Sequence, residues 1–259
     1  MGLLEGRKGL VFGIANDRSI ALHIARHLIE QGATCLFPCL PGEKSERRVR
    51  LALEEIGITE PWMMPCDVSK DEDLEAVFAA TRERLDTIDF VIHSVAYANR
   101  MFLKPGRFVD TPRDVFAQAL DISTYSLVAM VQRAKELMPK GGSIIALTYY
   151  GSEKAIPGYN VMGVAKAALE ASCRYLASEL GAHGIRVNTI SAGPLRTLSA
   201  MAVGGIDEIF DLVAVKAPLR RNIDVGEVGK AAAFLLSDLS SGITGENIHV
   251  DAGFSMMGL

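Results

Sequence analysis

Short apolar runs alternate with longer segments of helical period along this chain. The run 8–12 is followed by a stretch from Ser19 on which Ile20, Ile24 and Leu28 recur every fourth residue. Such a repeat places apolar side chains on one face of a helix, whereas a short continuous run is typical of a buried strand. The beginning of the chain therefore predicts a strand followed by a helix.

The same alternation continues to the end of the chain. Further strands are predicted at 34–39, 62–66, 90–93, 143–148, 186–190 and 247–250, and helices at 43–56, 71–85, 112–138, 159–180 and 225–236. Strand follows helix each time, which is the pattern of repeated β-α-β units. The strand at 143–148 is almost continuously apolar, as expected in a parallel sheet that helices cover on both faces.

No repeat of fixed length, charge block or Pro/Ser-rich linker interrupts the series. We therefore expect an α/β fold, a Rossmann-type doubly wound parallel sheet in three α/β/α layers, with residues 1–259 in a single domain. The segments 97–112 and 192–205 are rich in Gly, Pro and small residues, and each follows a strand. Because open α/β sheets bind ligands beyond their strand ends, these segments are the predicted walls of a site, with a lid around 192–222.

Composition excludes several classes of protein. Lys and Arg total 27 against 31 Asp and Glu, so no global basic field attracts nucleic acid or an anionic membrane. No stretch approaches the roughly 18 apolar residues of a membrane span, and the first residues match neither a signal peptide nor a myristoylation motif. The four cysteines form no Cys-x-x-Cys pair and are interpreted as reduced core residues. The expectation is a soluble cytoplasmic protein.

The turn after the first strand is a candidate phosphate site. It reads GIANDRSI from Gly13 to Ile20 and lacks the Gly-x-Gly-x-x-Gly pattern of dinucleotide-binding proteins. A turn of small residues before a helix still presents backbone N–H groups and the helix dipole to a pyrophosphate, and Ser19 could add a hydroxyl donor. An ordinary turn at Gly13 and an ordinary N-cap at Ser19 explain the same residues equally well.

Other strand ends border the same crevice. The third predicted strand ends before Asp67 and Val68, and Val95 follows the fourth. Asp67 could accept a hydrogen bond from an adenine amino group, although an Asp in a turn before a helix is the commoner use. The second strand closes at Leu40, with neither an acidic residue for ribose hydroxyls nor an adjacent Arg or Lys for a 2′-phosphate. We therefore expect NADH, with NADPH left open.

Tyr159 and Lys166 are the candidate catalytic pair. If both are helical, about 3.6 residues per turn places them on one face, with a phenol and an ammonium beside one site. The phenol could hydrogen-bond a carbonyl oxygen that gains negative charge, while Lys166 could bind ribose hydroxyls and favour proton release from the phenol. A half-buried Tyr and a surface Lys on any long helix would match the same spacing.

The motifs taken together resemble one family. Common short-chain dehydrogenase/reductases use Tyr-x₃-Lys with a Ser thirteen residues before the Tyr, and those positions here hold Met162 and Tyr149. The whole chain instead resembles the NADH-type bacterial enoyl-[acyl-carrier-protein] reductases, a divergent branch of that superfamily. The resemblance is carried by the segments 13–20, 66–68, 93–94, 191–197 and 251–255 and by Tyr149, Tyr159 and Lys166.

The resemblance implies NADH-dependent reduction of trans-2-enoyl thioesters in fatty-acid elongation, with hydride passing to C3 and a proton to C2. In that scheme Tyr159 stabilises the enolate oxygen and Lys166 holds the nicotinamide ribose. Tyr149 lines the site beside the substrate, and its part in protonation is open. The family also implies a homotetramer. No metal is expected, because His23 and His27 have the spacing of a ligand pair but no third ligand pattern.

The same resemblance supplies the remaining candidate binding residues. It places Ala98 at the substrate, Leu40 near the adenine, and 195–199 against the nicotinamide amide and diphosphate. The complete predicted set is Gly13, Ser19, Ile20, Leu40, Asp67, Val68, Val95, Lys166, Leu195, Thr197 and Ser199 for the cofactor, and Ala98, Tyr149 and Tyr159 for the substrate.

The chain departs from the family pattern in two places. Leu40 and Ala96 stand where the best-known members have Gln and Gly. The segment 206–211 carries three acidic residues where familiar members have basic residues that meet the acidic carrier protein. Like charges would repel, so Lys216, Arg220 and Arg221 are the alternative contacts, and a coenzyme A thioester is an alternative substrate.

Two other functions compete with this hypothesis. A carbonyl or alcohol dehydrogenase of the short-chain class needs the Ser and Tyr that Tyr149 and Met162 replace. A non-catalytic nucleotide-binding relative would have no need to retain Tyr149, Tyr159 and Lys166 together. We therefore expect an NAD(P)H-dependent oxidoreductase that acts on a carbon–carbon double bond.

Overall fold

The strands predicted from the apolar runs all form, and they lie in one sheet. The computed structural model describes residues 2–198, 200–202 and 206–258. Within them, parallel pairing gives the order β3-β2-β1-β4-β5-β6-β7. The strands are β1 Lys8–Phe12, β2 Thr34–Cys39, β3 Met63–Pro65, β4 Phe90–His93, β5 Gly142–Thr148, β6 Ile185–Ala192 and β7 Asn247–Val250. The predicted doubly wound parallel sheet is confirmed.

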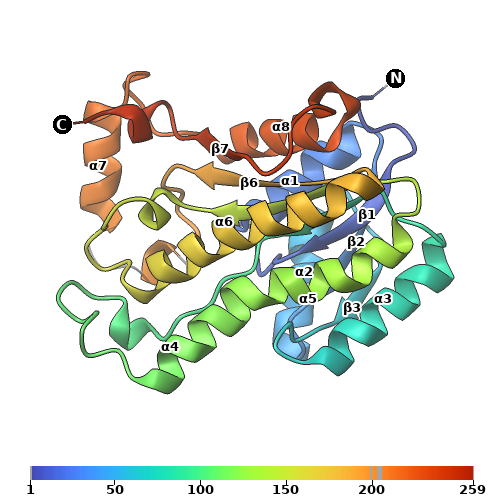
Figure 1. The fold of residues 1–259 in the computed structure, drawn as a ribbon, viewed down its shortest axis with the longest axis horizontal. Helices are drawn as coiled ribbons and strands as arrows, with labels where there is room; N and C mark the ends of the chain where they lie inside the picture. The colour runs from blue at the N-terminus through green and yellow to red at the C-terminus, as the bar shows by residue number, and fades with distance from the viewer. Residues whose placement is uncertain (1, 199, 203–205, 259) are drawn as a thin grey trace.

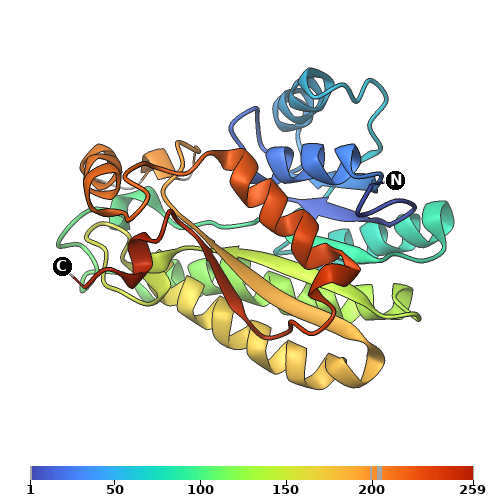
Figure 2. The same cartoon turned by 90° about the horizontal axis from the view of Figure 1, so that it is seen from above.

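Helices cover both faces of the sheet, so the fold has three layers (Figures 1 and 2). One core cluster joins the sheet to α1, α2 and α8, and a second joins its other face to α3, α5 and α6. The helices are α1 Ile20–Glu30, α2 Glu43–Glu55, α3 Asp71–Leu85, α4 Arg113–Leu120, α5 Ser126–Ala134, α6 Val161–Leu180, α7 Ile206–Lys216 and α8 Val225–Leu236.

The two-sided core explains why the strands are continuously apolar. Successive side chains of a strand point to opposite faces, and in β1 Leu10 and Phe12 enter one cluster while Val11 enters the other. All three are buried. No helix in the described part of the chain is both long and apolar enough to cross a membrane.

The strand order reverses at β1, because β2 lies on one side of it and β4 on the other. Loops leave the two strands in opposite directions at such a point and open a crevice at their carboxyl ends. Gly13 follows β1 with a φ of +103°, and a Cβ built on it would lie 2.1 Å from the carbonyl oxygen of Ser94 after β4. Only glycine lets the two loops approach this closely.

Two of the long predicted helices differ from the expectation in their detail. The segment predicted at 112–138 is α4 and α5 joined by a π-helical turn, Asp121–Tyr125, and it ends in a short 3₁₀ turn, Lys135–Leu137. The helix predicted from residue 159 begins at Val161, because Asn160 adopts φ +48° and ψ −122°. The prediction that Tyr159 is helical is therefore wrong.

Candidate active site

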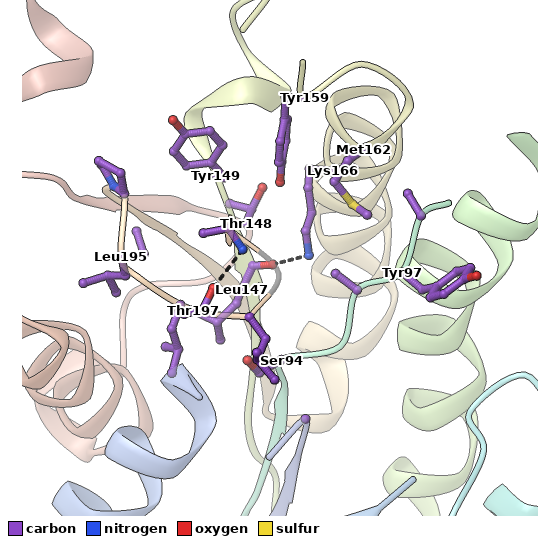
Figure 3. Close-up of a pocket in the computed structure, with 18 of the residues that line it drawn as sticks. Ser94, Tyr97, Leu147, Thr148, Tyr149, Tyr159, Met162, Lys166, Leu195 and Thr197 are labelled. Atoms are coloured by element: carbon purple, nitrogen blue, oxygen red, sulfur yellow. Dashed lines mark hydrogen bonds between the residues drawn. The ribbon is translucent and has the colours of Figure 1, made fainter. Parts of the chain in front are cut away.

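A cavity of about 580 Å³ opens at the carboxyl ends of β1, β4, β5 and β6 (Figure 3). Its volume is within the range of small-molecule and cofactor sites. Both loose segments line it, as does Ile209 of α7. The predicted site residues that line the cavity are Gly13, Ser19, Ile20, Val95, Ala98, Tyr149, Tyr159, Lys166, Leu195 and Thr197.

Three of the predicted cofactor residues are not among those that line this cavity. Leu40, Asp67 and Val68 follow β2 and β3, at the same edge of the sheet but further from the switch point. The turn interpretation of Asp67 is confirmed, because its Oδ1 accepts hydrogen bonds from the Ser69 backbone N–H and hydroxyl at 3.1 and 2.7 Å. Ser199 lies outside the described residues.

The turn between β1 and α1 is shaped by Ser19. Its Oγ accepts hydrogen bonds from the backbone N–H groups of Ala15 and Asn16 at 2.9 and 3.0 Å. It also donates to Asn16 Oδ1, and it makes no capping bond to the helix. The predicted hydroxyl contact with a phosphate would therefore compete with bonds inside the turn. The turn still lines the cavity at the N-terminus of α1, where backbone N–H groups and the helix dipole favour an anion.

Tyr159 reaches the cavity from the turn before α6. Its ring packs on Gly151, where an added Cβ would lie 2.3 Å from Tyr159 Cδ1, and it meets the Tyr149 ring edge-on at 5.0 Å between centroids. Figure 3 shows the Tyr159 hydroxyl pointing into the pocket on the side of Lys166, whereas the Tyr149 hydroxyl points away from it. The two tyrosines therefore present one phenol to the centre of the site.

Burial keeps both phenols protonated. Desolvation raises the pKa of Tyr159 far above its ordinary value, and the neighbouring Tyr149 and Glu170 raise it further. Desolvation also raises the pKa of Tyr149 to about 12. The largest cause of both shifts is the cost of burying a phenolate. The effect of Lys166 on proton release from Tyr159 stays a prediction. Tyr159 is a hydrogen-bond donor at neutral pH.

Lys166 is buried on α6, with only 5% of its surface exposed. Its Nζ donates to the carbonyl oxygen of Leu147 at 2.7 Å, and the other two N–H protons have no partner among the described residues. Burial lowers the pKa of Lys166 to about 8, and the nearby carboxylate of Glu170 acts in the opposite direction. The ammonium is therefore charged at neutral pH and close to its titration point.

Glu170 is a buried residue of this region that the sequence analysis did not identify. Its Oε1 accepts hydrogen bonds from the hydroxyls of Thr148 at 2.6 Å and Ser152 at 2.5 Å. Thr148 directly precedes Tyr149 in the chain, and Ser152 follows it by three residues. It follows Lys166 by one helical turn on α6, so the i, i+4 spacing was the available signal. A Lys and a Glu four residues apart on a solvated helix face show the same spacing. The sequence therefore does not reveal that Glu170 is buried.

Hydroxyl groups of the π-helical turn and of Ser126, the first residue of α5, bond to segments beside the cavity. Ser123 Oγ accepts from the Tyr97 N–H at 2.9 Å and donates to the Tyr97 carbonyl, and Thr124 Oγ1 donates to the Ala165 carbonyl. Ser126 Oγ lies 2.8 Å from Nε2 of His93, which is fully buried. Burial lowers the pKa of His93 to about 3, with a smaller effect from Lys166, so this imidazole is neutral.

His23 and His27 make contacts of their own. His23 Nε2 lies 3.0 Å from the Asp17 carbonyl, and His27 Nδ1 lies 3.1 Å from Glu30 Oε2. Across the described ranges, no group of three His, Cys, Asp or Glu side chains is arranged to hold a metal.

The fold and the site together define a class. A doubly wound parallel sheet carries a turn of small residues at its switch point, and a buried phenol and ammonium face the same cavity. These are the features of a nicotinamide-dependent oxidoreductase of the short-chain dehydrogenase/reductase superfamily.

Comparison with known proteins identifies the branch. The sequence profile of a family described as enoyl-(acyl carrier protein) reductase matches residues 13–255. A Bacillus cereus protein named enoyl-[acyl-carrier-protein] reductase [NADH] FabI is 51% identical over 258 residues, covering 100% of both chains. A Staphylococcus aureus protein of the same name with [NADPH] is also 51% identical, covering 97% of each chain. This chain belongs to the enoyl-(acyl carrier protein) reductase family.

Solved structures agree with the sequence comparison. The Bacillus cereus enoyl-acyl carrier protein reductase with NADP⁺ and indole naphthyridinone superposes with a TM-score of 0.96 at 51% identity, with both chains covered completely. The enzyme of Anaplasma phagocytophilum in complex with NAD gives a TM-score of 0.94 at 45% identity, covering 100% of this chain and 97% of that chain. The resemblance found in the motifs is confirmed over the whole chain.

Proposed function

We propose that this chain reduces the trans-2 double bond of enoyl thioesters carried by acyl carrier protein, with NADH as electron donor, in fatty-acid elongation. The observation that carries the proposal is the placement of the Tyr159 phenol and the Lys166 ammonium on one side of the switch-point cavity, with Tyr149 against the Tyr159 ring. Met162 lines the cavity at the position of the common catalytic tyrosine and has no proton to donate.

Tyr159 is the proposed electrophilic group. Its protonated hydroxyl donates a hydrogen bond to the thioester carbonyl oxygen, and this bond strengthens as the oxygen becomes an enolate when C3 gains a hydride. The enolate then collapses as C2 accepts a proton that derives from solvent, which restores the thioester carbonyl. Because the ring rests on Gly151 and Tyr149, the donor is held in place before the substrate arrives.

The site residues fit a nicotinamide cofactor. The Gly13 turn leaves no room for a Cβ beside Ser94, and the buried Lys166 offers two N–H donors to the cavity. When bound, NADH supplies the hydride. Lys166 would hold ribose hydroxyls, and the Gly13 turn with the N-terminus of α1 would hold the pyrophosphate. Leu195 and Thr197 would form the wall on the nicotinamide side.

The other half of the cavity is proposed to hold the acyl chain, because its walls are apolar. Ala98 and Leu103 pack against the start of α6, and Tyr159 packs on the same cluster. The apolar residues of the cavity lining that we assign to this part are Ala98, Leu103, Ile156, Met162, Leu198 and Ile209.

The carrier protein is proposed to approach over the segment 97–113. That segment has four basic residues against one acidic residue, whereas 206–222 has three of each. Arg221, one of the contacts predicted from the sequence, is held by Glu227 in two hydrogen bonds of 2.7 Å. Arg100 and Lys104 form no ion pair within the described residues, and Arg100 lines the cavity. An acidic partner would meet free positive charge there.

We also propose a cytoplasmic homotetramer. The layer of α5 and α6 leaves Tyr175 74% exposed, and Tyr125 and Val164 of the same layer are also exposed. Large apolar side chains on one helical layer are typical of subunit interfaces. The four cysteines are unpaired and buried, as in a reducing compartment. Light scattering should give a mass near four times 27.9 kDa.

The proposed reaction is tested by following NADH absorbance with matched thioesters. Loss of NADH is expected with trans-2-enoyl chains and not with 3-ketoacyl chains of the same length. The carrier-protein thioester should give a higher kcat/KM than the coenzyme A thioester, and added salt should reduce that advantage. No loss of NADH with any enoyl chain would refute the reaction, and a clear coenzyme A preference would refute the carrier.

Gly151→Ala tests how the Tyr159 ring is held. An added Cβ would lie 2.3 Å from Tyr159 Cδ1, so the ring must move. Because misplacement by 1 Å can cost about 10²-fold, we expect kcat/KM for an enoyl thioester to fall by roughly that factor. Gly181→Ala, where no atom lies within 4 Å of the added Cβ, is the matched control and should keep full activity. A fully active Gly151→Ala enzyme would contradict the described packing of the Tyr159 ring on Gly151.

A further inference from the structure

Asn160 is a strained residue whose side chain connects two walls of the cavity. Its backbone adopts φ +48° and ψ −122°, a conformation that glycine adopts easily and asparagine does not. Its Nδ2 donates to the carbonyl oxygens of Phe102 at 2.7 Å and Lys104 at 2.8 Å. Strained backbone persists where the surrounding structure enforces it, and here the two hydrogen bonds do so.

The two carbonyls belong to the segment that forms the apolar wall. Residues 100–102 form a short 3₁₀ turn, in which Leu103 N–H donates to Arg100 and Phe102 N–H donates to Asn99. On either side of this turn, Ala98 and Leu103 are buried against Val161 and Met162 of α6. The two hydrogen bonds from Asn160 Nδ2, here called the tether, therefore join the residue next to Tyr159 to the wall that faces the cavity.

We propose that Asn160 is a positioning residue that fixes the separation between Tyr159 and the wall 98–104, and that it thereby sets the preference for acyl-chain length. A short acyl chain reaches the Tyr159 hydroxyl with little use of this wall. A longer chain must pass along Ala98 and Leu103 while its carbonyl stays at Tyr159. The enzymatic part of this inference rests on the proposed function.

Asn160→Gly removes the tether and leaves a residue that adopts the same backbone without strain. We expect kcat/KM for a dodecenoyl thioester of the carrier protein to fall by about tenfold or more, and that for the crotonyl thioester by at most about threefold. The Kd of NADH should not change. A general folding defect would instead alter the Kd of NADH and reduce turnover at both chain lengths.

Hydrogen exchange gives a readout that is independent of activity. The amides of Phe102 and Leu103 should exchange about tenfold faster in Asn160→Gly, while those in the middle of α6 should not change. Asp86→Gly is the matched control, because Asp86 also has a positive φ, of 64°. Asp86 is exposed and lies between α3 and β4, at the amino ends of the strands and away from the cavity. It should alter neither chain-length preference nor exchange at 98–104.

Asn160→Asp is a second variant, because a carboxylate keeps the shape of the side chain but cannot donate to the two carbonyls. It should show the same chain-length dependence. Equal losses at both chain lengths, no loss at either, or unchanged exchange at Phe102 and Leu103 would each overturn the proposal. If the wild-type enzyme reduces neither thioester, the proposed function fails, and the exchange measurement still decides whether the tether exists.

Discussion

Tyr159→Phe should lower kcat/KM for an enoyl thioester by about 10²–10³-fold, or about 3–4 kcal/mol of transition-state stabilisation. The substitution removes one hydroxyl and keeps the ring that packs on Gly151 and Tyr149. The lost donor faces an oxygen whose charge develops only during the reaction, so kcat should carry most of the effect. Steady-state kinetics with an enoyl thioester of fixed chain length measures it.

Tyr149→Phe is the matched comparison for this result. The Tyr149 hydroxyl points away from the centre of the pocket, so its loss should reduce kcat/KM much less. The Kd of NADH should be unchanged in Tyr159→Phe, because the phenol is assigned to the substrate. Unchanged turnover in Tyr159→Phe would contradict its assignment as the electrophilic group.

Lys166→Met should weaken NADH binding by about 10- to 100-fold, because hydrogen bonds to a charged group contribute about 1.5–3 kcal/mol. Methionine fills much of the same buried space and removes the ammonium, which lies beside the Leu147 carbonyl. Titration of cofactor fluorescence measures the Kd. Lys230→Met on the exposed face of α8 is the control and should bind NADH as the wild type does.

The pH dependence of NADH binding follows from the same residue. Burial lowers the pKa of Lys166 to about 8, so the ammonium is charged below that pH and is lost above it. Affinity should therefore be constant below about pH 8 and fall as pH rises through it, toward that of Lys166→Met. Constant affinity from pH 7 to 10 would contradict the role of Lys166.

Other buried groups do not interfere with that titration. Burial lowers the pKa of His93 to about 3, so its imidazole stays neutral. Burial raises the pKa of Cys35, Cys66 and Cys173 to about 12 and that of Cys39 to about 11, so the thiols stay protonated. Lys166→Met should consequently lose the pH dependence of NADH binding between pH 7 and 10.

The sheet could be predicted because two-sided burial leaves a direct trace in the sequence. Strands such as β5 are buried on both faces, so their continuous apolar runs stand apart from the helical repeats on either side. The crevice could be predicted from the loose segments that follow strands, since loops at the carboxyl ends of parallel strands meet at one edge of a sheet. The lining residues Gly13 and Val95 were predicted from their place after strands, and Tyr159 and Lys166 from their spacing. Tyr149 was predicted from the family resemblance.

The features that could not be predicted from the sequence depend on backbone dihedral angles and on how deeply side chains are buried. The apolar repeat suggested that Tyr159 is helical, but Asn160 breaks the helix through a positive φ that no periodicity reveals. The burial of Tyr159 and Lys166 sets the direction of their pKa changes. The spacing of the two residues in the sequence does not reveal how deeply their side chains are buried. Glu170 has the pattern of a solvated helix residue, although it holds two hydroxyls beside the site.

In the proposed reaction a hydride is delivered to C3 of an enoyl thioester bound beside Tyr159. Reaction with NADH deuterated on both hydrogens of nicotinamide C4, followed by NMR of the saturated product, tests it most directly. We expect one deuterium at C3 and a solvent-derived proton at C2. Deuterium at C2, or a product in which the carbonyl rather than the double bond has been reduced, would contradict it.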